Sequence, residues 1–181
     1  MNKKTRNILL AMVAALVVGS CIFMFSLSSN STVKEEIVEA ENMEMIEANI
    51  TTSELTKGIV VEQKFINKTE NIKEVAVVFS RIYYLDGKDA NTEITIELCD
   101  GKEVLCNQTI LANDIPDQHR VYVNPINSIS GKKGKELTLK IYENSGCDTG
   151  VSLMANSDAK TSYSFGNKKN NGSICFSIVG E

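Results

Sequence analysis

The residues with catalytic potential are scattered along the chain and do not form a recognisable reaction centre. His119 and Arg120 follow Asp117 in "DIPDQHRVYV". A histidine beside an aspartate can act as a base, but no serine or cysteine nucleophile can be assigned to it. The carboxylates that a glycosidase would need lie in expected turns or on the polar sides of expected strands. We therefore predict a protein that is not an enzyme, and keep His119 and Arg120 as candidates for ligand binding.

Tyrosines are the other candidates for ligand binding, because the face of an aromatic ring suits the C–H groups of a sugar. The chain has five Tyr and no Trp. Tyr83 and Tyr84 lie where an expected strand runs into the loop "LDGKDAN", and adjacent strand residues point to opposite faces. Tyr163 lies near a late loop in "TSYSFGN". We name these three tyrosines as candidates, with packing in a sheet as the alternative role.

Five cysteines are present, and Cys21 lies in an apolar N-terminal run. The other four allow three pairings. The Asp100-Gly101 step in "EITIELCDGKEVLCNQTI" predicts a hairpin turn, which would place Cys106 opposite residue 95 or 96 and Cys99 on the other face. This geometry disfavours a bond between those two, so we predict a disulfide between Cys147 and Cys175.

Metal sites and cofactors are not predicted. No C-x-x-C motif is present and the chain has a single histidine, which argues against zinc. A D-x-D-x-D-G calcium loop is also missing, although a calcium site assembled from distant loops would leave no such signature.

The N-terminal run from Ile8 to Leu27 is uncharged and follows three basic residues without an acid. A helix of 20 residues spans about 30 Å, the thickness of the hydrocarbon core of a bilayer. We predict a cytoplasmic end at 1–7 and a transmembrane anchor at 8–27, with the rest of the chain outside the cell. Two alternatives stay open: the segment "VGSC" resembles a lipobox that would be lipidated at Cys21, and a cleaved secretory signal would also place the domain outside.

Residues 28–54 are predicted to form an acidic stalk, because Val33 to Ala48 holds six Glu and one Lys. A partner-binding helix is the alternative for this stretch. The remaining chain has no basic stripe, which argues against nucleic acid as a partner.

Residues 55–181 show alternation of apolar and polar residues between turn signals, the pattern of β-strands. The strands are expected in "GIVVEQKFI", "VAVVFSRIYYL", residues 94–98 and 103–110, "HRVYVNPI", "ELTLKIY", "VSLMA" and "ICFSIV". Their alternation predicts the inward-facing residues, which are Ile59, Val61, Phe65, Val75, Val77, Phe79, Ile94, Ile96, Leu98, Val104, Cys106, Val121, Val123, Leu137, Leu139, Ile141, Val151, Leu153, Ile174, Phe176 and Ile178. About eight short strands without a long helical pattern predict an all-β sandwich or jelly roll.

The order of these elements resembles the galactose-binding-like jelly-roll domains of bacterial extracytoplasmic, membrane-anchored proteins. The resemblance covers about residues 55–181. It rests on "LTKGIVVEQKF", in which Gln63 and Phe65 match a Gln-x-Phe at the first strand pair, on "GKELTLKIYENSGCDTGVSLMAN" and on the final "SICFSIVG". It implies a non-catalytic module that contacts carbohydrate. We therefore expect a tethered module that binds envelope carbohydrate or another surface ligand; the alternative is an accessory protein that docks on a neighbouring membrane complex.

Overall fold

The computed structural model describes residues 38–40, 48–81, 92–115, 120–123, 125, 127–144 and 149–180. The predicted anchor at 8–27, with Cys21, lies outside the described residues. Within the described ranges, no helix is both long enough and apolar enough to cross a bilayer.

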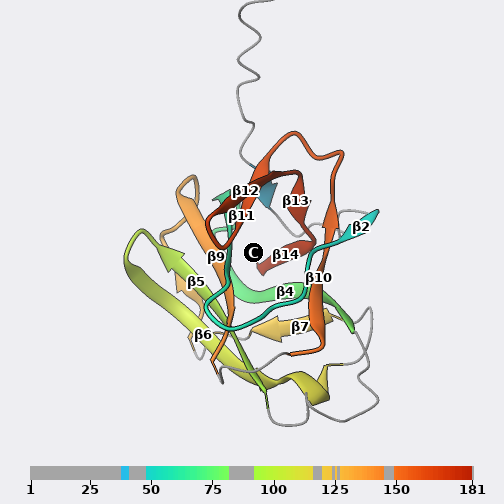
Figure 1. The fold of residues 1–181 in the computed structure, drawn as a ribbon. Coiled ribbons are helices and arrows are strands. Elements are labelled where there is room, and N and C mark those ends of the chain that lie inside the picture. The colour runs from blue at the N-terminus through green and yellow to red at the C-terminus, as the bar shows by residue number, and fades with distance from the viewer. Residues whose placement is uncertain are drawn as a thin grey trace, which may run out of the picture. The chain divides into compact units, whose positions relative to one another are not determined.

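The described residues form strands β1 to β14 and one short 3-10 helix, η1 (Figure 1). The strands are β1 (Val38–Ala40), β2 (Ile50–Thr51), β3 (Val60–Asn67), β4 (Asn71–Arg81), β5 (Glu93–Asp100), β6 (Glu103–Leu111), β7 (Arg120–Val123), β8 (Ile129–Ser130), β9 (Glu136–Glu143), β10 (Val151–Asn156), β11 (Ser162–Phe165), β12 (Lys168–Asn171), β13 (Ser173–Ile174) and β14 (Phe176–Gly180); η1 is Ala112–Asp114.

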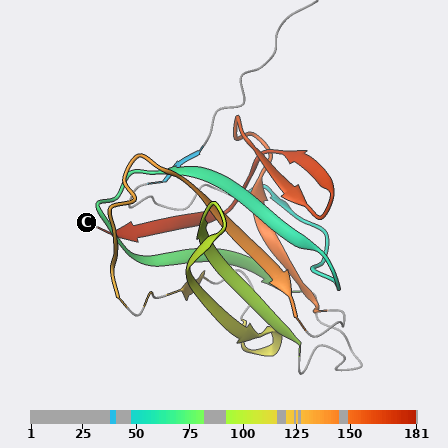
Figure 2. The same ribbon diagram turned by 90° about the vertical axis from the view of Figure 1, so that its left-hand side faces the viewer.

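These strands form two sheets. Sheet A has the order β12-β11-β3-β9-β5-β6, with β1 alongside β3. Sheet B has the order β13-β10-β4-β14, with β2 on β10 and with β7 and β8 on β4. All pairs are antiparallel except β1 with β3. Figure 2 looks onto sheet A, with β4 and β14 of sheet B behind it. The predicted all-β sandwich is confirmed.

The core lies between the two sheets and follows from the alternation in the sequence. Alternate side chains of a strand point to opposite faces, and the predicted inward sets of β9, β10 and β14 are buried. Strand β4 is buried on both faces from Val75 to Phe79, as a strand central to its sheet should be. The confirmed inward residues are Val61, Phe65, Val75, Val77, Phe79, Leu137, Leu139, Ile141, Val151, Leu153, Ile174, Phe176 and Ile178.

The chain passes from β10 to β4 within its C-terminal segment: β13 pairs with β10, and β14 pairs with β4. The Cys175 amide donates to the Met154 carbonyl at 2.8 Å, and the Val78 amide donates to the Cys175 carbonyl at 3.0 Å. Directly after Cys175, the ring of Phe176 contacts the ring of Phe65, with 5.0 Å between the ring centroids. This aromatic contact joins β14 of sheet B to β3 of sheet A.

Gln63 is a fully buried polar side chain in this apolar interior. Its amide nitrogen Nε2 donates to the carbonyls of Lys64 at 3.0 Å and Ser162 at 3.2 Å, and its Oε1 accepts from the Ile174 amide at 3.3 Å. One side chain thus links β3 and β11 of sheet A to β13 of sheet B, and satisfies polar groups that would be costly to bury alone.

Three features differ from the sequence-based expectations. Strands β1 and β2 lie within 28–54, the predicted stalk, and both pair with sandwich strands, so the sheets begin before residue 55. The segment "TSYSFGN", expected near a loop, belongs to a hairpin of β11 and β12. The third difference concerns the turn between β5 and β6.

The β5–β6 hairpin turns at Gly101 and Lys102, and Cys106 lies opposite Leu98 rather than residue 95 or 96. An extra residue at Leu105 shifts the register, which makes this part of β6 a β-bulge. Leu105 and Cys106 both pack against the core, while Val104, expected to face inward, is exposed. The prediction for Val104 was wrong because the extra residue at Leu105 puts Val104 and Cys106 on opposite faces of the strand. Cys99 does lie on the face opposite to Ile94, Ile96 and Leu98, as predicted.

Substitution of Gln63 tests the buried amide. We expect Gln63→Leu to lower the free energy of unfolding by about 1–3 kcal/mol, because it leaves buried backbone groups of Ser162 and Ile174 without partners. Urea unfolding measures this, and the half-buried Gln108 provides the matched control Gln108→Leu. Equal effects of the two substitutions would contradict the role assigned to Gln63.

Gly172 tests the approach of β13 to β10. Its φ is +106°, and a Cβ atom there would lie 2.4 Å from the Asn156 carbonyl oxygen. Gly131 also has a positive φ, of +69°, but a Cβ atom there meets nothing within 4 Å. We expect Gly172→Ala to lower the melting temperature clearly more than Gly131→Ala. Both variants place alanine at a positive φ, which strains the backbone, and only Gly172→Ala adds a steric clash. Similar melting temperatures of the two variants would argue against this close approach.

Candidate functional site

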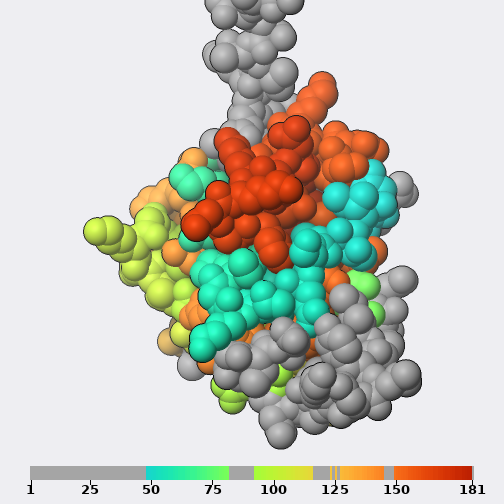
Figure 3. Space-filling view, in the orientation of Figure 1, coloured from blue at the N-terminus to red at the C-terminus, as the bar shows by residue number. Residues whose placement is uncertain are grey.

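A hollow of about 520 Å³ lies on the outer face of sheet A, where the β11–β12 hairpin adjoins β3 and β9. In Figure 3 the orange-red surface of this hairpin borders the teal surface of the β3 region. All the lining residues other than Tyr163 and Gly166 have polar or charged side chains. The lining consists of Glu62, Lys64, Glu136, Thr161, Ser162, Tyr163, Ser164, Gly166, Asn167 and Lys169.

Strand pairing places one residue from each of four strands in a row across the sheet, and three of them, Glu62, Ser164 and Lys169, line the hollow. Lys140 of β9 lies opposite Glu62 of β3, Glu62 lies opposite Ser164 of β11, and Ser164 lies opposite Lys169 of β12. Because all four point to the same face, cationic, anionic and hydroxyl groups alternate across about three strand spacings of roughly 4.8 Å each. The row continues to Glu97 of β5 beyond Lys140.

Both carboxylates of the hollow are held by lysines. Lys64 Nζ lies 2.9 Å from Glu136 Oε1, and Lys140 Nζ lies 3.1 Å from Glu62 Oε1. The hydrogen bond that Lys140 donates to Glu62 is the main cause that raises the pKa of Lys140. These pairs orient the charged groups, and each carboxylate keeps a second oxygen that no described contact uses.

Tyr142 extends the polar face beside the row. Its hydroxyl donates to Glu97 Oε1 at 2.8 Å. Burial and this hydrogen bond raise the pKa of Tyr142 to about 12. The phenol therefore stays protonated and holds Glu97 in place at the end of the row.

Tyr163 is the sequence-predicted candidate that lies at the hollow. Its side chain is only 6% exposed, and this burial raises its pKa. On β11 it points inward opposite Gln63, whereas its neighbours Ser162 and Ser164 point outward. Tyr163 thus supports the wall of the hollow and does not present a ring face to solvent.

The other lining residues were missed from the sequence because no strand was expected at β11 and β12, and because Glu62, Lys64 and Glu136 lie on expected strands with no sign that they meet this segment. A signal was available: Gly166-Asn167 separates Phe165 from Lys168 by two residues, and Gly-x is a two-residue hairpin signal. No local pattern, however, indicates that this hairpin pairs with β3, about a hundred residues earlier.

The remaining predicted site residues are not brought together by the described part of the structure. Tyr83, Tyr84, His119 and Cys147 lie outside the described residues. Arg120 begins β7, where its Cα lies opposite that of Val78 in sheet B. The predicted role of Tyr83, Tyr84, His119 and Arg120 in ligand binding stays a prediction.

The three described cysteines form no disulfide with one another. Cys175 is buried at the crossing between β10 and β4, and burial raises its pKa to about 11. Cys99 is also buried, and desolvation raises its pKa. The pairing of Cys147 with Cys175 stays a prediction.

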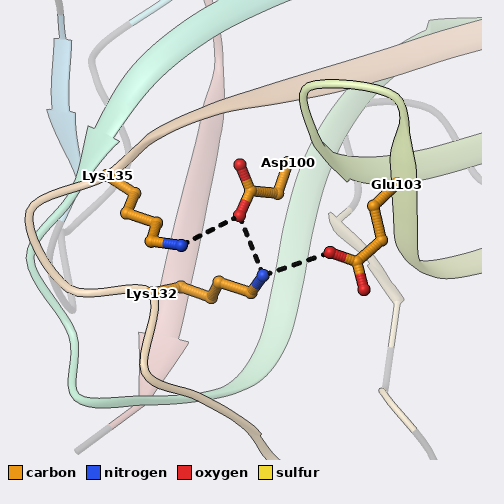
Figure 4. Close-up of polar contacts among 4 residues, drawn as sticks. All are labelled: Asp100, Glu103, Lys132 and Lys135. Atoms are coloured by element: carbon orange, nitrogen blue, oxygen red, sulfur yellow. Dashed lines mark hydrogen bonds and ion pairs between the residues drawn. The ribbon is translucent and has the colours of Figure 1, made fainter.

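A second charged cluster lies at the β5–β6 turn (Figure 4). Lys132 Nζ is 2.8 Å from Asp100 Oδ2 and 3.3 Å from Glu103 Oε2, while Lys135 Nζ is 3.4 Å from the same Asp100 oxygen. The hydrogen bond from Lys132, and then that from Lys135, hold the pKa of Asp100 below its usual value. All four charges are compensated within the cluster, so it fastens the turn to the segment before β9.

Among the residues that the structure describes, no group of three or more His, Cys, Asp and Glu side chains is arranged to hold a metal ion. Comparison of the chain with models of protein families and with curated proteins finds no match.

The Asp100 cluster predicts a pH-dependent contribution to stability. A carboxyl group whose pKa is lowered on folding stabilises the fold above its unfolded pKa, near 4, and loses that contribution as the pH falls through the lowered value. The difference in free energy of unfolding between wild type and Asp100→Asn should therefore be constant from about pH 7 to 5 and shrink below about pH 4. Urea unfolding as a function of pH measures this, with Asp114→Asn as the control; a difference that persists at the lowest pH would be inconsistent with it.

Proposed function

We propose that this protein is a membrane-tethered, extracytoplasmic binding module that holds a polar carbohydrate of the cell envelope in the hollow of sheet A. The observation that carries the proposal is the lining of that hollow, in which hydroxyl, amide, carboxylate and ammonium groups converge from four strands. Its volume of about 520 Å³ lies within the range of small-molecule sites, roughly 300–1,000 Å³.

The chemistry of the hollow suits hydroxyl-rich ligands. Sugar hydroxyl groups both donate and accept, and the lining offers acceptors at Glu62 and Glu136 and hydroxyl groups at Ser162 and Ser164. Hydrogen bonds to charged partners are stronger than neutral ones. Because the one aromatic residue of the lining, Tyr163, is buried, recognition relies on these polar groups rather than on ring stacking.

The proposal assigns binding and no catalysis to this site. A glycosidase uses one carboxyl group as an acid and another as nucleophile or base. Here each of the two carboxylates is held by a lysine at 2.9 or 3.1 Å. Carboxylates held this way serve as fixed acceptors, which is the role that a binding site needs.

The proposal also includes the jelly-roll type of the sandwich and its position outside the cell. The sandwich is of the jelly-roll type, in the manner of galactose-binding-like domains; the positions of Gln63 and Phe65 in the core support this, since both members of the resemblance motif have a structural role. The uncharged run Ile8–Leu27 supports an anchor that leaves the sandwich outside the cell. The alternative is an accessory protein that docks on a membrane complex without a small ligand.

Filling the hollow tests the proposal. The full chain in detergent should co-sediment saturably with a cell-wall or capsular polysaccharide of the source organism, and Ser164→Phe should weaken binding by about tenfold or more, equivalent to about 1.4 kcal/mol. Ser128→Phe, at an exposed serine outside the hollow, is the matched control and should bind like wild type.

Two outcomes would overturn this assignment. Binding that Ser164→Phe leaves unchanged would place the carbohydrate elsewhere on the molecule. Failure to bind any polysaccharide fraction would favour the accessory alternative, to be followed by crosslinking in native membranes.

A further inference from the structure

The two edges of sheet A differ in how they are protected from pairing with another chain. Exposed sheet edges expose unpaired backbone groups, and natural proteins protect them with short strands and with lysines. At one edge, β12 has four residues and carries Lys168 and Lys169. At the other, β6 has nine residues and a single charged one, Glu103, at its end. In the part of the chain that the structure describes, no backbone hydrogen bond joins β6 to a strand other than β5.

Strand β6 also carries exposed apolar side chains. Of the three large apolar residues that are exposed among the described residues, two are Val104, at 47%, and Leu111, at 39%. Val104 lies opposite Cys99, and Leu111 lies opposite Glu93. Both therefore point to the outer face of sheet A, at the two ends of the strand.

The bulge at Leu105 sets the spacing of these two residues. Because Leu105 and Cys106 together occupy one position opposite Leu98, Val104 lies three positions before Gln108, and Leu111 lies three positions after it. A two-fold axis at Gln108 would pair β6 with a second β6 in antiparallel register. Each Val104 would then lie against the Leu111 of the other copy.

We propose that β6 is a self-association edge, at which two copies of this chain pair their β6 strands in antiparallel register centred on Gln108. This is an isologous contact, in which one surface is its own complement. Charge supports a second copy as the occupant: the strand is neutral between Val104 and Leu111, and the two Glu103 residues lie at opposite ends of the pair. The pairing satisfies the open backbone edge and covers both exposed apolar residues.

Pairing about this axis keeps the two copies of sheet A in one continuous sheet with their outer faces on the same side. The hollow at β11–β12 lies at the far edge from β6. If the proposed function is adopted, the pair therefore presents two hollows toward one surface, and avidity strengthens binding to a polymeric ligand. The pairing itself is tested without any ligand.

The mass of the full chain in detergent micelles, measured by light scattering across a dilution series, tests the pairing. Wild type should be dimeric, and Asn107→Lys should raise the dissociation constant by about tenfold or more, because it places two lysines beside the axis. Asn107 is exposed and lies opposite Glu97, so the new lysine has a carboxylate partner within its own fold. Asn171→Lys, on the lysine-bearing edge β12, is the matched control and should stay dimeric.

A crosslinking experiment tests the register. Chains with Val104→Cys, mixed with differently tagged chains with Leu111→Cys, should form a disulfide-linked heterodimer under mild oxidation, with the bond mapped by mass spectrometry. Replacing the second partner by Asn171→Cys should abolish it. A monomeric wild type, a dimer that Asn107→Lys leaves intact, or equal crosslinking by Asn171→Cys would each overturn the proposal.

Discussion

The buried amide of Gln63 is the contact on which the arrangement of the described strands most depends. It lies in an apolar interior, where a polar group without partners is expensive, so its three hydrogen bonds must form together. Those bonds bring β11 to the edge of β3 and the start of the C-terminal segment to the same point. Two residues later Phe65 packs against Phe176. Over the three residues from Gln63 to Phe65, β3 therefore joins the two sheets twice, by a hydrogen bond of Gln63 and by the ring contact of Phe65.

The outward-facing residues of β3 line the hollow. Alternation that turns Gln63 and Phe65 inward turns Glu62 and Lys64 outward. The inward hydrogen bond from Gln63 to the Ser162 carbonyl also sets where the outward hydroxyl groups of Ser162 and Ser164 lie relative to Glu62. The geometry of the hollow is thus coupled to the core, and the rigidity of the proposed site comes from buried groups behind it.

Sheet A combines two kinds of surface on one framework. Its β12 edge is short and cationic and borders the hollow, whereas its β6 edge is long, neutral and partly apolar. The charged cluster around Lys132 fastens the β5–β6 turn to the segment before β9, so the β6 edge is held in a defined orientation. The proposed binding site and the proposed self-association edge therefore do not use the same residues.

The sequence by itself determined the all-β class, most of the strands and most inward-facing residues, because alternation with period two survives wherever one face of a strand is buried. It failed at Val104, because one extra residue at Leu105 puts Val104 and Cys106 on opposite faces, and it did not predict strand β11, on which Tyr163 lies inward. Only the tertiary structure decided that β11 pairs with β3 and that Glu62, Glu136 and Ser164 share one surface. These residues lie about 30 to 100 positions apart, and pairing over such distances is set by the closing of the two sheets on their core rather than by any local pattern.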